Sequence, residues 1–187
     1  MPTNPMHRLC AAVLLLVVVG AQAQAPAEPD VAAQRAAMAR LAWMAGVWEG
    51  QSVTREREGE KRSVSYEWIR SAAGGLAIMV QGRHYRQLPD GGRGEVVLDT
   101  AGMFTYDAAA SKYLFVTQLQ NGRGGTMEAV MQGETLSWRI PLAGAHVRYD
   151  ITRSDKGQWN EKGHFCRDGA PCQPFFEMVL DRKGDAP

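Results

Sequence analysis

Residues 41–50 read Leu-Ala-Trp-Met-Ala-Gly-Val-Trp-Glu-Gly, and this stretch decides the fold. It closes an alanine-rich segment, residues 31–44, whose composition predicts a helix with Asp30 as its N-cap. Gly46 is expected to end that helix, because glycine is the usual residue just past a helix C-terminus. From Trp48 onward, apolar and polar side chains alternate with a period of two. The stretch therefore marks the change from one short helix to a first β-strand.

The alternation continues almost to the end of the chain and predicts about ten strands. They are expected at residues 48–57, 61–70, 76–87, 95–106, 112–120, 126–132, 135–142, 146–154, 158–166 and 174–182. Turn sequences such as Gly74-Gly75 and Asn121-Gly122 separate them, and these connections are too short for parallel crossovers. Ten sequential antiparallel strands would leave exposed edges in an open sheet, and closure into a barrel removes those edges. The sequence thus predicts an all-β fold, a single antiparallel up-and-down barrel after a short N-terminal helix, with a sandwich as the structural alternative.

The start of the chain has the pattern of a secretory signal peptide. An unbroken apolar run covers residues 9–19, which is too short to span a bilayer. Ala21-Gln22-Ala23 then places small residues at both positions that the peptidase reads, so cleavage is expected after Ala23, with Ala25 as the alternative. We therefore expect a signal peptide over residues 1–23, a flexible leader over 24–30 and one barrel domain over 31–187. The mature protein is expected in the periplasm or outside the cell.

The charge balance excludes several classes of partner. Removal of residues 1–23 takes away Arg8 and no acidic residue, so the 21 basic residues fall to 20 against 20 acidic ones. A neutral chain lacks the basic surface that nucleic acids or anionic membranes attract. No second long apolar run follows the leader, so no stable membrane insertion is expected after its removal.

The stretch at residues 41–50 resembles the start of the small exported calycin-like proteins of unknown function, the DUF1579-type group. Further local similarities are Gly74-Gly75-Leu76, Tyr106-Asp107 with Lys112-Tyr113, and Leu180-Asp181-Arg182. The resemblance implies a lipocalin-like barrel of about ten strands with an internal cavity, and it implies no settled activity.

A more distant resemblance is to the nitrobindin-like haem barrels, which open with a similar Gly-x-Trp-x-Gly strand. Their closing strand typically carries Gln-Pro-His, and its histidine ligates iron. Here the matching residues are Gln173-Pro174-Phe175, and a phenylalanine cannot ligate a metal. His84, His146 and His164 are not paired at metal-ligand spacings either. Haem is therefore disfavoured, and the sequence predicts no cofactor and no metal site.

Two residues are given structural roles by the same resemblance. In lipocalin-like barrels the first-strand tryptophan packs at the closed end, and an arginine of the last strand lies over it. This implies that Trp48 packs at the barrel floor with Arg182 above its ring. Such a cation–π contact contributes about 0.5 to 2 kcal/mol.

Cys166 and Cys172 are the cysteines that remain after the leader is removed. The turn pair Asp168-Gly169 lies between them, so the two thiols can meet across a hairpin. Disulfides persist in exported proteins, and this pair lacks the two-residue spacing that lowers a thiol pKa in redox motifs. We predict a structural disulfide.

The apolar faces of the strands carry many aromatic and sulfur-containing side chains that are expected to line the interior. The tentative ligand-binding residues are Tyr66, Trp68, His84, Trp138, Tyr149 and Phe176. Apolar pockets with a few polar anchors are typical of small-molecule sites, so the leading hypothesis is a non-enzymatic barrel that binds a small, largely apolar molecule. A solid plug of the same side chains is the alternative packing.

Two other functions stay open. One is an enzyme for a small hydrophobic substrate, with His84 or a tyrosine as acid or base, although no catalytic residue can be assigned from the sequence. An inward His84 beside a buried carboxylate would favour it. The other is a cell-envelope interaction module with a filled barrel and a working outer surface.

Overall fold

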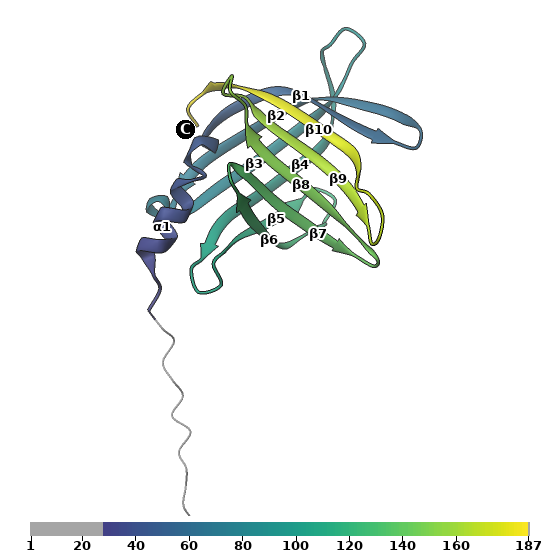
Figure 1. The fold of residues 1–187 in the computed structure, drawn as a ribbon. Coiled ribbons are helices and arrows are strands. Elements are labelled where there is room, and N and C mark those ends of the chain that lie inside the picture. The colour runs from purple at the N-terminus through teal and green to yellow at the C-terminus, as the bar shows by residue number, and fades with distance from the viewer. Residues whose placement is uncertain (1–27, 187) are drawn as a thin grey trace, which may run out of the picture.

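The computed structural model describes residues 28–186. It is a closed barrel of ten antiparallel strands in simple sequential order, with the first strand paired to the last (Figure 1). The predicted all-β up-and-down barrel is confirmed, and the sandwich alternative is wrong. The expected signal peptide, residues 1–23, lies outside the described residues, as does most of the expected leader.

The elements follow the predicted alternation closely. The strands are β1 (Gly46–Glu56), β2 (Gly59–Ala72), β3 (Ala77–Gln87), β4 (Arg93–Asp107), β5 (Lys112–Leu119), β6 (Gly124–Gln132), β7 (Thr135–Leu142), β8 (Ala145–Arg153), β9 (Trp159–Arg167) and β10 (Gln173–Gly184). Helix α1 (Val31–Ala39) precedes them, and short 3-10 turns occupy η1 (Ala42–Met44) and η2 (Ala73–Gly75). Every strand boundary lies within two residues of its predicted position.

The N-terminal helix is shorter than predicted. Its N-cap is Asp30, whose carboxylate accepts a hydrogen bond from the Ala33 backbone N–H at 2.9 Å. The helix ends at Ala39, and Gly46 opens β1 rather than terminating the helix. The reason lies in the close approach of β10, because a Cβ on Gly46 would sit 2.9 Å from the Gly184 carbonyl oxygen.

Helix α1 and the turn η1 close one end of the barrel. They insert Met38, Leu41 and Met44, all at most 2% exposed, into the core. The Tyr113 hydroxyl donates a hydrogen bond to the Ala37 carbonyl at 2.8 Å, and the Arg40 guanidinium donates to the Gly133 carbonyl at 2.6 Å. These contacts fix the helix across the strand ends at the left of Figure 1.

Trp48 lies at the closed end as the resemblance implied, but its partner is different. Its indole N–H donates to the Met44 carbonyl at 2.7 Å, and its ring meets Trp43 and Trp159 edge to face. Arg182 instead donates to the Ala45 carbonyl at 3.1 Å and pairs with an acidic side chain near the C-terminus. The expected cation–π contact is wrong, because two tryptophan rings already cover Trp48.

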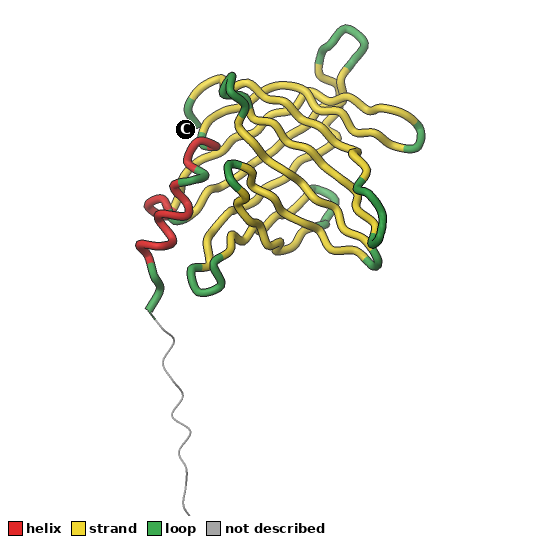
Figure 2. The backbone as a smooth tube through the Cα atoms, viewed as in Figure 1, coloured by secondary structure: helices red, strands yellow, loops and turns green. Residues whose placement is uncertain are grey.

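The opposite end of the barrel is open. In an up-and-down barrel, alternate turns fall at the same end, so the β1–β2, β3–β4, β5–β6, β7–β8 and β9–β10 turns all lie away from α1. Two of these hairpins project well beyond the barrel wall, as the loops at the right and top of Figure 2 show. The interior is thus closed at the α1 end and accessible from the opposite end.

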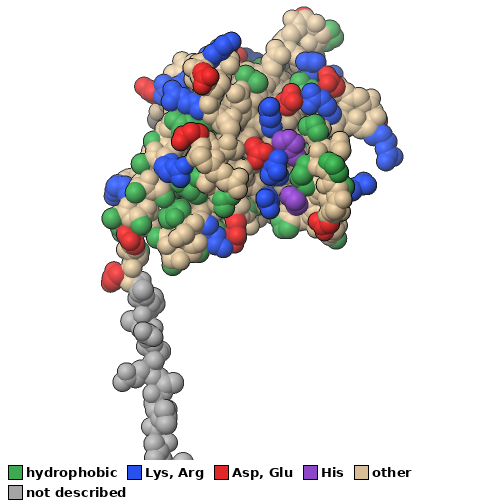
Figure 3. Space-filling view, in the orientation of Figure 1, with side chains coloured by type: hydrophobic (Ala, Val, Ile, Leu, Met, Phe, Trp, Pro, Cys, Tyr) green, Lys and Arg blue, Asp and Glu red, His purple; other side chains and the backbone are tan. Residues whose placement is uncertain are grey.

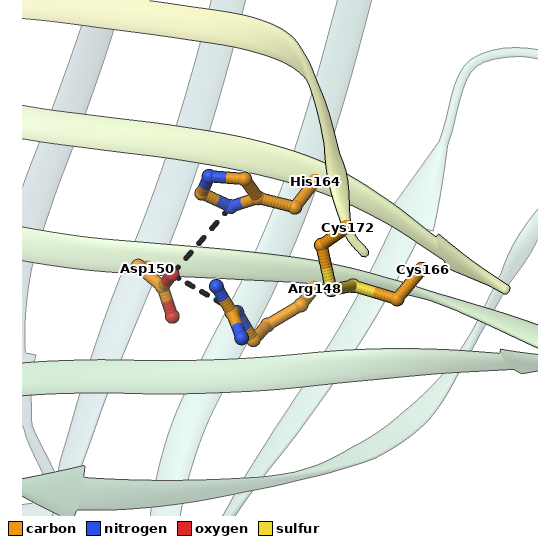
Figure 4. Close-up of a disulfide and its surroundings, with 5 residues drawn as sticks. All are labelled: Arg148, Asp150, His164, Cys166 and Cys172. Atoms are coloured by element: carbon orange, nitrogen blue, oxygen red, sulfur yellow. Dashed lines mark hydrogen bonds and ion pairs between the residues drawn. A yellow bond between two sulfur atoms is a disulfide. The ribbon is translucent and has the colours of Figure 1, made fainter. Parts of the chain in front are cut away.

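The predicted disulfide is present. Cys166 at the end of β9 bonds to Cys172 just before β10, with their Cα atoms 4.1 Å apart. Figure 4 shows a charged group beside it on the outer surface, in which Asp150 lies between Arg148 and His164. The disulfide therefore joins two neighbouring strands at the open end.

The outer surface mixes charges of both signs on the face drawn in Figure 3. Among residues 28–186, no helix is long and apolar enough to cross a membrane.

Candidate functional site

The barrel interior holds a cavity of about 650 Å³. The lining residues come from nine of the ten strands, β2 to β10, and from the β5–β6 turn, and most of them are apolar. Small-molecule sites of roughly 300–1,000 Å³ bury most of a drug-sized ligand. The interior is therefore an open pocket rather than a solid plug of side chains.

Aromatic rings form much of the wall. Trp138 and Tyr149 are stacked with ring centroids 4.4 Å apart, and Phe115 meets Trp138 edge to face at 5.2 Å. Phe104 stacks on Phe115 at 4.1 Å, which continues the aromatic wall toward the closed end. Phe176 of β10 meets the Tyr149 ring edge to face, with centroids 6.0 Å apart. Rings held by one another in this way form a rigid, apolar wall.

Four of the six predicted lining residues do face the cavity: His84, Trp138, Tyr149 and Phe176. Tyr66 and Trp68 do not, and their expected place in the lining is wrong. They lie on the outer face of β2, stacked on each other at 5.8 Å. The Tyr66 hydroxyl donates to Glu49 at 2.8 Å, and the Arg93 guanidinium covers its ring at 5.2 Å. The two rings thus cover each other, and the Arg93 guanidinium covers Tyr66, so both side chains are partly shielded from water on the outer face of the barrel.

The inner face of β2 is accordingly polar. Ser65 is fully buried, and its hydroxyl shares a hydrogen bond of 2.9 Å with that of Ser52 on β1. Glu67 also points inward and is 6% exposed. Its carboxylate lies directly over Gly82 of β3, where a Cβ would approach the Glu67 Oε1 atom to 2.6 Å. The glycine leaves the space that this carboxylate occupies.

Glu67 and His84 form a buried pair. The His84 Nε2 and Glu67 Oε1 atoms are 3.4 Å apart, and both side chains are less than one-tenth exposed. The Phe176 ring lies parallel to the imidazole, with centroids 6.5 Å apart. A neutral or protonated imidazole nitrogen can donate toward the carboxylate in this geometry, although the separation is long for a hydrogen bond.

A second acidic side chain, Glu161 of β9, lines the same cavity. Burial raises its pKa from the ordinary value to about 8, and the negative charge of Glu67 adds to the effect. The nearby Trp159 indole lowers the pKa of Glu161 slightly. The indole nitrogen itself makes no hydrogen bond of ordinary geometry within the described residues. Burial also raises the pKa of the Tyr149 hydroxyl. At neutral pH, Glu161 is therefore mostly a carboxylic acid that can donate a proton or a hydrogen bond.

Sequence reasoning missed both acidic residues. The signal for Glu161 was its spacing, because it lies two residues from the apolar Trp159 on the same strand, and both residues line the cavity. The signal for Glu67 was weaker, since alternation on β2 also allows Tyr66 and Trp68 to face inward. Only Ile69, which is fully buried, marks the side of Glu67 as the inner one.

The mouth of the cavity lies at the open end. Leu98, Leu119 and Leu142 line it together with Arg123 of the β5–β6 turn. This turn was predicted and is confirmed, but the place of Arg123 at the mouth was not foreseen. Within the described chain, the Arg123 guanidinium is in no ion pair. The cavity thus has a cation at its mouth and acidic groups farther in.

Metal-binding groups do not gather in the described part of the chain. Residues 28–186 contain no cluster of three His, Cys, Asp or Glu side chains suited to a metal ion. The outer histidine, His164, has its Nδ1 atom 3.6 Å from Asp150, which also accepts hydrogen bonds from Ser137 and Arg148. This group lies on the outside of the barrel and takes no part in the cavity.

Two solved structures show the same fold. Rv2717c from M. tuberculosis superposes with a TM-score of 0.57 at 13% identity, over 79% of this chain and 97% of its own. The S-type phycobiliprotein lyase CPES from Guillardia theta gives a TM-score of 0.54 at 10% identity, over 81% of this chain and 93% of its own. These are ten-stranded barrels of the calycin-like kind. At such identities the likeness shows the fold alone.

No protein-family model and no curated protein matches this chain. The resemblance to the DUF1579-type group therefore stays a prediction.

Proposed function

We propose that this chain is an exported barrel that binds a small, largely apolar molecule in its interior. The observation that carries the proposal is the cavity of about 650 Å³ with its aromatic wall and few polar groups. The same fold in a phycobiliprotein lyase and in Rv2717c agrees with a ligand-holding barrel. A cavity of this size argues against the interaction module with a filled barrel.

The shape of the wall favours a flat ligand. Trp138 and Tyr149 are stacked nearly parallel, 14° apart, and both rings line the pocket. An aromatic or conjugated body stacked there would bury much of its surface, at about 25 cal/mol for each Å² of apolar area. The ligand enters at the open end, because α1 and η1 fill the other.

Two matched variants test binding inside the barrel. Thr117 lines the cavity, whereas its neighbour Val116 faces outward on the same strand and is 42% exposed. Thr117→Trp fills part of the cavity, and Val116→Trp adds the same ring outside. We expect the neutral fluorophore N-phenyl-1-naphthylamine to bind the natural protein and Val116→Trp alike, and Thr117→Trp at least tenfold more weakly. Equal binding by all three proteins would contradict the proposal, as would no binding by any.

The ligand itself is sought by native mass spectrometry of protein purified from its own host. A bound small molecule that disappears in Thr117→Trp and stays in Val116→Trp would identify the natural occupant.

Export is supported by the disulfide between Cys166 and Cys172, since such bonds persist mainly outside the reducing cytosol. The test is the mass of the protein recovered from the periplasm or the medium. We expect a product that begins at Gln24, or at Pro26 if cleavage follows Ala25. A full-length chain retained in the cytosol would contradict the proposal.

A second function is favoured by one specific observation, which is the inward His84 beside the buried Glu67. Glu161, mostly protonated at neutral pH, lies in the same cavity, so one site holds a proton donor and a proton acceptor. Such a pair suits an enzyme that moves a proton on a small apolar substrate. We propose this activity as the alternative to simple binding.

The alternative is tested with the host's own small molecules. The natural protein and Glu161→Gln are each incubated with a host metabolite extract, and the extracts are compared by liquid chromatography and mass spectrometry. Enzymatic turnover predicts a compound that disappears only with the natural protein, whereas binding alone leaves the extract unchanged.

A further inference from the structure

The acidic groups of the cavity have too few partners of their own. Among the described residues, the one polar partner of the Glu67 carboxylate is His84, at the long distance of 3.4 Å. Glu161 is half-buried, faces the cavity and makes no hydrogen bond of ordinary geometry among the described residues. The buried indole nitrogen of Trp159 on the same strand also lacks a partner. A buried carboxyl group is normally hydrogen-bonded to other groups. Leaving a buried charged group without a partner costs on the order of several kcal/mol.

The acidic side chains of the cavity lack a positively charged partner. Five titratable side chains line the cavity: Glu67, His84, Arg123, Tyr149 and Glu161. The one permanent cation among them, Arg123, sits in the β5–β6 turn at the mouth, and the two acidic groups lie on the strands farther in. No described lysine or arginine lines the inner part.

We propose that the cavity selects amphipathic cations, molecules whose protonated nitrogen reaches Glu67 and Glu161 while an apolar body fills the space toward the mouth. This inference rests on the proposed function, since it names the class of ligand for the same cavity. The nitrogen donates hydrogen bonds to the carboxyl groups and replaces the partners that the protein does not supply.

The aromatic wall suits the same ligand. Tyr149 lies in the cavity with its ring between Trp138 and Phe176, at centroid distances of 4.4 and 6.0 Å. A cation held near such ring faces is stabilised electrostatically, and an apolar body gains contact area with the same rings. The His84 imidazole lines the same cavity, stacked on Phe176 with ring centroids 6.5 Å apart, so its ring also borders the ligand.

Ligand charge is coupled to the proton on Glu161. The groups that face this carboxyl are Glu67 from β2, His84 from β3, Tyr149 from β8 and Trp159 on its own strand. A bound cation stabilises the ionised form of Glu161, so its proton leaves for the solvent as the cation enters. Binding of an amine at pH 7 should therefore release up to one proton for each molecule bound.

The test uses three ligands of the same size and different charge. They are 2-naphthylmethylamine, 2-naphthylmethanol and 2-naphthoate, titrated into the full-length mature protein by calorimetry at pH 7. We expect the amine to bind at least tenfold more tightly than the alcohol, and the carboxylate most weakly. Glu67→Gln should remove most of the amine's advantage and leave the alcohol's affinity unchanged. Glu134→Gln, an exposed turn residue outside the cavity, is the control and should bind like the natural protein.

Proton release by the natural protein gives a first readout that does not depend on a variant folding. Titrations in two buffers with different ionisation enthalpies should show release with the amine and none with the alcohol. In Glu161→Gln the release should disappear.

Each outcome separates this inference from the proposed function. Equal affinity for amine and alcohol overturns the cation preference and leaves an apolar binding barrel. Tighter binding of the carboxylate also overturns it and makes Arg123 the selecting group. If neither these ligands nor N-phenyl-1-naphthylamine binds, the proposed function falls as well.

Discussion

Replacement of Glu161 by glutamine should stabilise the protein, and the gain should grow with pH. The pKa of this carboxyl rises from 4.5 to about 8 on folding. Between pH 4.5 and pH 8, the folded state therefore holds a proton that the unfolded chain releases. A raised acid pKa gives full stability below the unfolded value and lowers stability as the pH climbs toward the folded value. Glutamine keeps the shape of the neutral acid and has no such pH dependence.

The magnitude follows from the shift. Each pKa unit corresponds to about 1.4 kcal/mol, so the loss in the natural protein is on the order of 3 kcal/mol at pH 7 and of 4 to 5 kcal/mol above pH 8.5. At pH 4 it is close to zero. Urea unfolding of the natural protein and Glu161→Gln at pH 4, 5.5, 7 and 8.5 measures the difference directly, provided that the m-values agree.

Two controls check the reasoning. Glu134→Gln in the exposed β6–β7 turn should show no pH-dependent gain. In a Glu67→Gln background the gain from Glu161→Gln should shrink, because the charge of Glu67 contributes to the raised pKa. A difference that stays constant from pH 4 to 8.5, or that falls with rising pH, would refute the buried-acid account of this cavity.

Three further predictions concern packing and stability. Gly82→Ala should push the Glu67 carboxylate away from β3, since the new Cβ would lie 2.6 Å from its oxygen. Calorimetry should then show weaker amine binding. Unchanged affinity would mean that the carboxylate does not need the space over Gly82. Reduction of the Cys166–Cys172 bond should lower the free energy of unfolding by about 2 kcal/mol, because the closed loop is short; a change below about 0.5 kcal/mol in urea unfolding would show that the bond constrains little. Asp30→Ala should cost about 1 kcal/mol through loss of the helix cap, and a melting temperature equal to that of the natural protein would mean that α1 is held by its packing alone.

The fold could be predicted because each strand carries its own signal. Period-two alternation and the glycine turns place all ten strands, and sequential hairpins leave closure as the way to remove edges. The disulfide was equally local, since the turn pair between Cys166 and Cys172 brings the two thiols together.

The site was harder because it depends on which face of each strand turns inward. On β2, the aromatic pair Tyr66 and Trp68 suggested the wrong face, since their rings are covered outside by Arg93 and by each other. Glu67 then occupies the inside because β3 offers a glycine opposite it. Such compensation between strands distant in sequence cannot be read from one strand at a time.

The pairing of the first strand with the last has a consequence for the order of folding. Arg55 on β1 reaches Glu177 on β10 across 122 residues of sequence, whereas every other strand pairs with its neighbour in the chain. Hairpins from β2 to β9 can form early, since they close short loops, but the ring cannot close until β10 has been synthesised. The cavity is therefore the last part of the molecule to be completed, and a chain that ends before residue 173 would lack β10 and have no enclosed interior.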